Sequence, residues 1–363
     1  MSEETSPVSH LPVVMTTDQE ETTQTTDVTS SSSRGAAVYF ECFVFVIGAI
    51  GTAASGLILY VLIASKQHKK QMLIVNQNAL DLYTCLFMVI TYAVKLANIR
   101  LSGTSGYFIC TFILSESLLV SGSFGSSINL TLIAIDRYLK VCHKVWSKKN
   151  ARKWMIYLAM IFAWISGFIY HMSLVFDTSI VINGVCYQYY IWKNPESKLA
   201  AGFYYVLSSY VIVLLISVFC YWKILMTIRR QARVMASHNP AGSSSAQDQL
   251  NKVQSNVIKT MILVCAFYAI AWMPEKTIAL LYSLGLLNML NVLNIILYYV
   301  AMFFGFLYIC ANPFIYATRF DPVRRILKGL ILCKEISGPD SGGVQMTWCG
   351  KHVPMWHDRN RKY

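Results

Sequence analysis

Long apolar stretches alternate with short polar segments along this chain. Seven of them are long enough to cross the hydrocarbon core of a bilayer, which takes about 20 mostly apolar residues. They lie near residues 37–64, 72–95, 107–139, 153–174, 201–227, 256–284 and 291–317. Because backbone amides in lipid must be paired within the segment, these stretches are predicted to be helices. The alternative is a soluble all-helical protein, but buried soluble helices rarely run past about 20 residues without a polar face.

The segments that flank these stretches complete the predicted architecture. The fold class is an all-α membrane protein, a seven-transmembrane helix bundle over residues 37–319. Residues 1–36 are acidic and rich in Ser and Thr, which predicts a disordered tail. In residues 320–335, apolar positions recur at helical spacing opposite Arg and Lys, which predicts a short amphipathic helix on the inner membrane surface. Residues 336–363 form a second polar tail.

The charge of the chain is sparse and one-sided. Only 13% of the residues are charged, against roughly 25% in a soluble domain. The net charge of +13 would suggest a nucleic-acid partner in a soluble protein, but most of the 31 Lys and Arg fall on one side of the predicted membrane. The positive-inside rule makes that side, with the C-terminal tail, cytoplasmic and the N-terminal tail extracellular. We therefore expect a multi-pass protein of the plasma membrane whose basic residues face the lipid bilayer, with no nucleic-acid partner.

Two of the ten cysteines differ from the rest in position. Most lie within the apolar stretches, where a small hydrophobic side chain is the expected role. Cys110 opens the third stretch on the outer side, and Cys186 lies in the outer loop after the fourth, a compartment that permits disulfides. A Cys110–Cys186 disulfide is predicted, the alternative being two free thiols. Cys333, at the end of the predicted surface helix, is a candidate for palmitoylation.

Polar and kinking residues inside the apolar stretches are candidates for function, because they cost free energy in lipid. Asp81 lies deep in the second stretch. Pro274 in the sixth stretch and Pro313 in the seventh each remove a backbone hydrogen bond and bend the helix. The third stretch ends at an ion pair and a phenol, Asp136-Arg137-Tyr138.

In their order and placement, these features resemble the rhodopsin-like family of G-protein-coupled receptors, from about residue 37 to 335. The positions that carry the resemblance are Asp81, Cys110, Cys186, Asp136-Arg137-Tyr138, Trp164, Tyr221, Trp272, Pro274 and Asn312-Pro313-Phe314-Ile315-Tyr316. The resemblance implies a receptor that binds an extracellular ligand, activates heterotrimeric G proteins and is not an enzyme. It also implies arrestin as a partner, and the few Ser and Thr of residues 336–363 predict weak recruitment.

The resemblance implies a two-state mechanism as well. An agonist in the outer half of the bundle shifts the equilibrium, the sixth helix swings outward about Pro274, and a cytoplasmic cleft opens for the G protein. In that mechanism Arg137 is released from Asp136 and meets the G protein. Trp272 forms the floor of the pocket and transmits ligand binding to the helix bend at Pro274. The residues expected to support the switch are Tyr138, Tyr221, Asn312, Pro313 and Tyr316.

The same resemblance suggests an allosteric sodium ion. Asp81, Ser126 and Asn312 match positions that hold sodium in relatives, where the ion favours the inactive state. The alternative is that Asp81 is hydrated and binds no ion. No other cofactor or metal is expected.

Several residues depart from the pattern of the family. Where relatives usually have Asn, Pro and a polar residue, this chain has Ser55, Val213 and Tyr308. Tyr268 and Ala271 replace the usual Phe and Cys before Trp272, and Cys110 lies two residues further from Arg137 than is typical. The departures concern the sodium site and the shape of the fifth span.

Two positions in the expected ligand pocket exclude well-known ligand classes. Amine receptors of the family carry an Asp where this chain has Leu119, so a protonated amine loses its counter-ion. Opsins carry a Lys where this chain has Phe306, so linked retinal is not expected.

Four charged residues fall near the same pocket: Lys95, Glu116, Glu275 and Lys276. Charges inside a membrane bundle are tolerated in pairs. One interpretation is an internal salt bridge, such as Glu116 with Lys276, and the other is direct contact with polar or charged groups of a ligand. With an aromatic outer loop and an acidic tail, these charges favour a peptide ligand.

Three other functions were weighed against a peptide receptor. A receptor of the same fold for a small lipid or carboxylate predicts that removing residues 1–34 leaves potency unchanged. A transporter is disfavoured because no internal repeat and no matching pair of broken helices is visible. An enzyme is disfavoured because no nucleophile with a base, metal-ligand cluster or phosphate-binding loop stands out, and His171 is interpreted as a bundle residue.

Overall fold

The fold was analysed in a computed structural model that describes residues 23–64, 71–150, 152–175, 179–188, 195–238, 245–287 and 291–319. Its helices are α1 (Thr23–Ala64), α2 (Met72–Ala97), α3 (Gly103–Phe108), α4 (Ser117–Cys142), α5 (Lys144–Asn150), α6 (Lys153–Val175), α7 (Pro195–Val206), α8 (Ile212–His238), α9 (Ser245–Ser283) and α10 (Val292–Arg319). Two π-helical turns, Ile109–Leu114 and Leu207–Val211, interrupt the third and fifth spans. Strands β1 (Ser179–Ile182) and β2 (Val185–Gln188) form an antiparallel hairpin.

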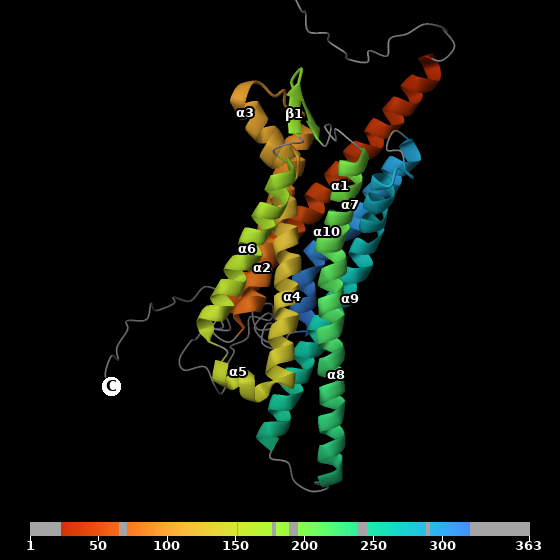
Figure 1. The fold of residues 1–363 in the computed structure, drawn as a ribbon. Coiled ribbons are helices and arrows are strands. Elements are labelled where there is room, and N and C mark those ends of the chain that lie inside the picture. Colours follow the sequence, from red (N-terminus) through yellow and green to blue (C-terminus); the bar gives the residue numbers. More distant parts are fainter. Residues whose placement is uncertain are drawn as a thin grey trace, which may run out of the picture.

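Seven of the described segments are long and apolar enough to span a membrane, which confirms the predicted helices and the all-α class. Their cores are Ala37–Ala64, Met72–Ala97, Gly103–Cys142, Lys153–Tyr170, Glu196–Gln231, Ile258–Ser283 and Leu293–Ile315. The chain runs back and forth between the two ends of one bundle (Figure 1). The predicted surface helix over 320–335, with Cys333, and the tail over 336–363 lie outside the described residues.

The third span is the centre of the bundle. Helix α4 packs against α2, α6 and α8, and 61% of the most apolar window of this span is buried. The corresponding window of the fourth span is only 17% buried, because α6 lies on the outside of the bundle. Most large apolar side chains of the peripheral helices are exposed, as expected of residues that contact lipid.

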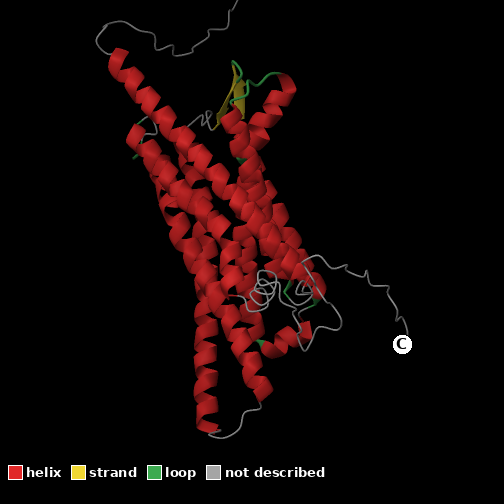
Figure 2. Cartoon of the chain, turned by 180° about the vertical axis from the view of Figure 1, so that it is seen from behind, coloured by secondary structure: helices red, strands yellow, loops and turns green. Residues whose placement is uncertain are grey.

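The hairpin β1–β2 and α3 lie at the same end of the bundle as the start of α1 (Figure 1). The far ends of α8 and α9 and the short helix α5 lie at the other end, as the view from behind also shows (Figure 2). Helix α1 begins at Thr23, so residues 23–36 are helical, although the sequence predicted a disordered tail through 36. Once an apolar span is helical, each further residue adds one backbone hydrogen bond without a new nucleation step, so a helix extends easily past the membrane boundary.

The third span is broken near its outer end. A π-helical turn over Ile109–Leu114 is followed by Glu116, which has a left-handed φ of 60° and precedes α4. Hydroxyl groups satisfy the backbone at the break, since Ser115 and Ser117 both donate to the Thr111 carbonyl, the latter at 2.6 Å. A π-helical turn holds an additional residue, so the break contributes to the unusual spacing between Cys110 and Arg137.

The fifth span bends without the proline that is common there. Its π-helical turn, Leu207–Val211, ends two residues before Val213. Side-chain hydroxyls again take over backbone partners: Ser209 donates to the Tyr205 carbonyl at 2.5 Å, and Tyr268 of α9 donates to the Ser209 carbonyl. Tyr268, a departure from the family pattern, thus joins the sixth span to the irregular turn of the fifth.

Candidate functional site

A disulfide fixes the outer loop over the bundle. Cys110 of the π-helical turn is bonded to Cys186 of β2, which confirms the predicted pairing. The Leu101 amide donates to the Gly184 carbonyl at the hairpin turn at 3.1 Å. The outer part of the third span and the hairpin are therefore tied at two points.

A narrow pocket lies in the outer half of the bundle, lined by residues of the third to seventh spans. Its wall combines apolar and aromatic side chains with six hydroxyl groups and one ammonium group. The hydroxyl groups belong to Ser123, Ser127, Tyr170, Tyr205, Ser209 and Tyr268. Leu119, Trp272, Phe306 and Lys276, all expected near the ligand, lie on this wall.

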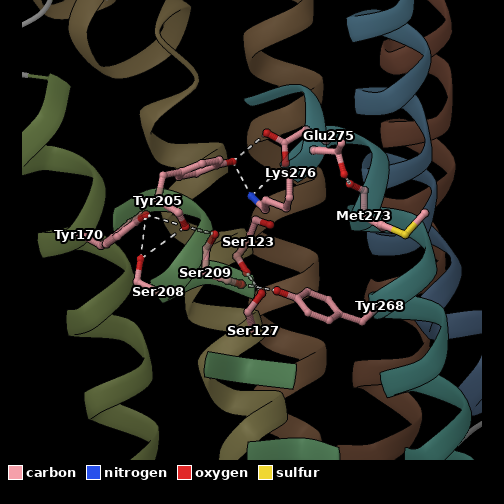
Figure 3. Close-up of polar contacts among 11 residues, drawn as sticks. Ser123, Ser127, Tyr170, Tyr205, Ser208, Ser209, Tyr268, Met273, Glu275 and Lys276 are labelled. Carbon is pink, nitrogen blue, oxygen red and sulfur yellow. Dashed lines mark hydrogen bonds and ion pairs between the residues drawn. The ribbon is translucent and has the colours of Figure 1, made fainter. Parts of the chain in front are cut away.

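The ammonium group belongs to Lys276, which is part of a buried polar network. Its Nζ atom is 3.0 Å from Glu275 Oε2 and donates to the Tyr205 hydroxyl at 2.5 Å. The Tyr205 hydroxyl donates in turn to Glu275 Oε1 at 3.1 Å. The Lys276 and Glu275 side chains are only 6% and 5% exposed. Figure 3 shows Lys276 and Tyr205 pointing toward one another, so the network joins the sixth span to the fifth.

Trp272 lies below this network and packs directly on the seventh span. A Cβ atom added at Gly305 would come within 2.9 Å of the Trp272 ring, so only glycine leaves room for the ring there. The Lys276 Nζ atom lies 5.0 Å from the centroid of the same ring. Trp272 therefore contacts the helix bend at Pro274, the pocket and the seventh span together.

A second ion pair lies nearer the outer end, between the second and third spans. Lys95 of α2 is paired with Glu116, and Tyr92 donates to the same Glu116 oxygen at 3.0 Å. The suggested pairing of Glu116 with Lys276 is therefore wrong. The break in the third span places Glu116 against the end of α2, while Lys276 is held by its sequence neighbour Glu275.

Asp81 lies fully buried among the residues predicted for a sodium site. Its carboxylate accepts hydrogen bonds from Ser126 at 2.8 Å and from Asn312 at 3.1 Å. The Asn312 amide oxygen is buried and has no hydrogen-bond partner among the described residues. Carboxylate, hydroxyl and amide oxygens are the ligands that hard cations prefer, so these residues fit a sodium ion.

Sequence reasoning missed the polar chain that extends from Asp81. Gln77 donates to Asp81 at 3.2 Å and accepts from Asn129 at 2.9 Å, and Asn129 accepts from Asn76. Trp164 of the fourth span donates to Asn76 at 3.0 Å. The signal was present in the sequence, because Asn76, Gln77 and Asp81 are polar residues within one apolar stretch and fall at helical spacing.

The end of the third span far from the disulfide holds the predicted ion pair in a loose form. Asp136 Oδ2 lies 3.9 Å from Arg137 Nε but 2.8 Å from Lys140 Nζ. Arg137 Nε is buried and has no hydrogen-bond partner among the described residues. The Tyr138 hydroxyl lies 3.0 Å from His143 Nε2, which holds this phenol toward the second inner loop.

The remaining predicted switch residues lie on three helices. Tyr221 is buried on α8, and Pro274 and Pro313 lie inside α9 and α10. Tyr316 is part of α10, but its side chain is outside the description.

The bundle, the covalently fixed outer hairpin and the pocket above a proline bend define a multi-pass membrane receptor with seven spans. Residues 54–316 match the family described as 7 transmembrane receptor (rhodopsin family), and the chain belongs to it. It is therefore a signalling receptor of the G-protein-coupled class, a family of non-enzymes, with a ligand and a G protein as its partners.

The relatives among characterised proteins are distant and varied. The chain is 25% identical to galanin receptor type 1 of Homo sapiens over 79% of its own length and 80% of that protein. It is 24% identical to C-C chemokine receptor type 8 of Mus musculus, covering 78% of the chain and 76% of the relative. It is 25% identical to melatonin receptor type 1A of Mus musculus, with 67% and 66% covered.

Proposed function

We propose that this chain is a plasma-membrane receptor, with its N-terminus outside and its C-terminus in the cytoplasm, that is activated by an extracellular peptide. The observation that carries the proposal is the pocket itself, a narrow wall of aromatic and hydroxyl groups directly above Trp272 and Pro274. The charged pair of Lys95 and Glu116 and the hairpin tied by Cys186 supply contacts further out.

The relatives support a peptide only in part. Two of them are named for galanin and chemokine ligands, which are peptides, while the third is named for melatonin, which is not. A small lipid or carboxylate is therefore the second candidate, favoured by the apolar side chains and the single ammonium group of the pocket.

In the proposed mechanism, a ligand above Trp272 shifts a two-state equilibrium toward a form in which the sixth span is displaced about Pro274. The network between Tyr205, Glu275 and Lys276 joins the fifth and sixth spans, so a ligand that contacts it changes the link between them. At the cytoplasmic end, Arg137 leaves Asp136 and contacts a heterotrimeric G protein. Tyr221 and Tyr316 support it from the fifth and seventh spans.

The experiment is nucleotide exchange on G proteins in membranes from cells that express the chain, challenged with neuropeptides alongside lipids and amines. We expect a peptide to raise exchange, and Arg137→Ala to abolish the response while ligand binding and surface expression persist. Lys149→Ala, an exposed cation at the same end of the bundle, is the matched control and should respond normally. Full exchange in Arg137→Ala would contradict the coupling role, and a response only to lipids or amines would contradict the peptide.

We also propose that Asp81, Ser126 and Asn312 hold a sodium ion, which supplies positive charge to the buried carboxylate and favours the inactive form. The purified receptor should melt at a higher temperature in sodium chloride than in choline chloride at equal ionic strength. Asp81→Asn should remove that difference. Equal melting temperatures of the unmodified receptor in the two salts would favour a hydrated Asp81 instead.

A further inference from the structure

The charges around the pocket are distributed unequally between its wall and the protein behind it. Lys276 lies on the wall, whereas Glu275 does not, and the described wall contains no carboxylate. Two other acidic residues of the outer bundle, Glu41 and Glu116, are not on this wall, and Glu116 is held by Lys95 and Tyr92. A ligand in the pocket therefore meets one cation and several hydroxyl groups, with no anion facing it.

Lys276 has the capacity to accept an anionic partner. An ammonium group has three donors, and that of Lys276 contacts the Glu275 carboxylate at 3.0 Å and the Tyr205 hydroxyl at 2.5 Å. Glu275 has a second partner in the Tyr205 hydroxyl at 3.1 Å, so it keeps a donor when Lys276 turns away. A buried lysine left with hydroxyl partners alone is costly, so the ligand carboxylate takes the place of Glu275 at Lys276. Glu275, which stays buried beside the Tyr205 hydroxyl, then takes up a proton, and this preserves the charge balance.

We propose that Lys276 binds a carboxylate group of the ligand in exchange for Glu275, and that the ligand of this receptor is an acid with an apolar or aromatic body. This inference rests on the proposed function and names the chemistry of the ligand at the same site. The body lies among the rings of Phe124, Trp272 and Phe306, which line the wall. A peptide with a free carboxyl terminus and a small aromatic acid both supply this chemistry.

Such an exchange also links the ligand to the helix that moves. Glu275 and Lys276 follow Pro274 directly, and Tyr205 belongs to α7 in the fifth span. A carboxylate on Lys276 replaces the contact between neighbours on one helix with a contact to the ligand. The connection between the fifth and sixth spans then passes through the ligand as well as through Tyr205.

The test measures melting of the full-length purified receptor with defined probes, and needs no G protein. The probes are 3-phenylpropionate, its neutral isostere 3-phenylpropanamide and the cation 3-phenylpropylamine. N-acetyl-Gly-Phe and its amide form the peptide pair. We expect one acid or both, at ten times their dissociation constants, to raise the melting temperature by about 2 °C or more, and the amides and the amine to have no effect.

Variants of the pair separate a ligand site from a structural salt bridge. Glu275→Gln removes the competing carboxylate and should raise the affinity for the acid about tenfold, whereas Lys276→Gln should abolish the shift. The double variant Glu275→Gln/Lys276→Gln leaves no buried charge unpaired, so it should fold but show no shift. Arg100→Gln, which alters an exposed cation at the outer end of the bundle, should keep the response to the acid. A salt bridge that serves only structure predicts no gain of affinity in Glu275→Gln.

Each outcome decides the inference separately from the proposed function. A shift with 3-phenylpropionate alone identifies a small carboxylate as the ligand, and a shift with N-acetyl-Gly-Phe alone identifies the carboxyl terminus of a peptide. Either result supports an anion-binding site at Lys276. No shift with either acid, an equal shift with the amides, or an undiminished shift in the double variant would overturn it. In those cases, peptide-stimulated nucleotide exchange would still support the proposed receptor function. Conversely, a melting shift with an acid would still support the site at Lys276 if no peptide stimulated exchange.

Discussion

The two ion pairs in the outer half of the bundle differ in what they connect. Lys95 and Glu116 come from the second and third spans, and their side chains are 23% and 16% exposed. Glu275 and Lys276 are neighbours on one helix and almost fully buried, and within the described part of the chain their hydrogen bonds to another span go to Tyr205. The outer pair, Lys95 with Glu116, links two helices. The inner pair, Glu275 with Lys276, places a cation on the pocket wall. The direct contact between Glu275 and Lys276 lies within one helix, so it is available for exchange with a ligand while Tyr205 still links the fifth and sixth spans.

The largest expected effect is the loss of stability when the lysine of each ion pair is replaced, and it should be greater for the more buried pair. Lys276→Met leaves the Glu275 carboxylate buried with only a hydroxyl partner, which should destabilise the receptor by roughly 3–5 kcal/mol. Lys95→Met should cost less than half of this, because water reaches Glu116 and Tyr92 still donates to it. Thermal melting of both variants in detergent measures the difference. Equal losses would show that the two pairs are equally dependent on their cations.

A charge exchange at the outer pair should have an intermediate effect. Lys95→Glu and Glu116→Lys each place like charges together, and the double variant restores attraction between the second and third spans. We expect a coupling energy of about 1 kcal/mol between the two sites from melting of the two single variants and the double variant. The same exchange at Glu275 and Lys276 should leave stability closer to that of the native chain than either single variant does, but should move the cation along α9. If the stability losses of the two single variants at Lys95 and Glu116 simply add in the double variant, the pair does not link the second and third spans.

The smallest effect concerns the backbone at Glu116. Its φ of 60° is unfavourable for a side chain with a Cβ atom by roughly 1–2 kcal/mol, and glycine removes this cost. In a Lys95→Met background, where the ion pair is already absent, Glu116→Gly should raise the melting temperature by about 1 °C. In a Lys276→Met background, Glu275→Gly should gain nothing from the backbone, because Glu275 lies inside α9 without a positive φ. A loss of stability on Glu116→Gly would show that other contacts outweigh the backbone term.

The features that the sequence predicted are those set by local pattern. The seven helices follow from the length of their apolar stretches, and the disulfide from the compartment of Cys110 and Cys186. The resemblance to the receptor family also placed Asp81, Ser126 and Asn312 together, and the structure brings them into hydrogen-bond contact.

The features that it missed depend on helix rotation. The partner of Glu116 could not be predicted, because one left-handed residue and a π-helical turn redirect its side chain. The contact of Tyr205 with Lys276 likewise depends on how the fifth span turns before its own π-helical turn. Periodicity identifies which residues share a face but assumes a regular helix, and both spans are irregular near the pocket.

The break in the third span makes the outer disulfide sensitive to chain length. Each residue of an α-helix turns the chain by about 100°, so two additional residues in a regular helix would rotate Cys110 by about 200°. The irregular turn absorbs them and keeps Cys110 facing β2. In a regular helix, deletion of one residue between Cys110 and Glu116 would rotate Cys110 by about 100° relative to α4, so the disulfide depends on the irregular backbone that precedes Glu116.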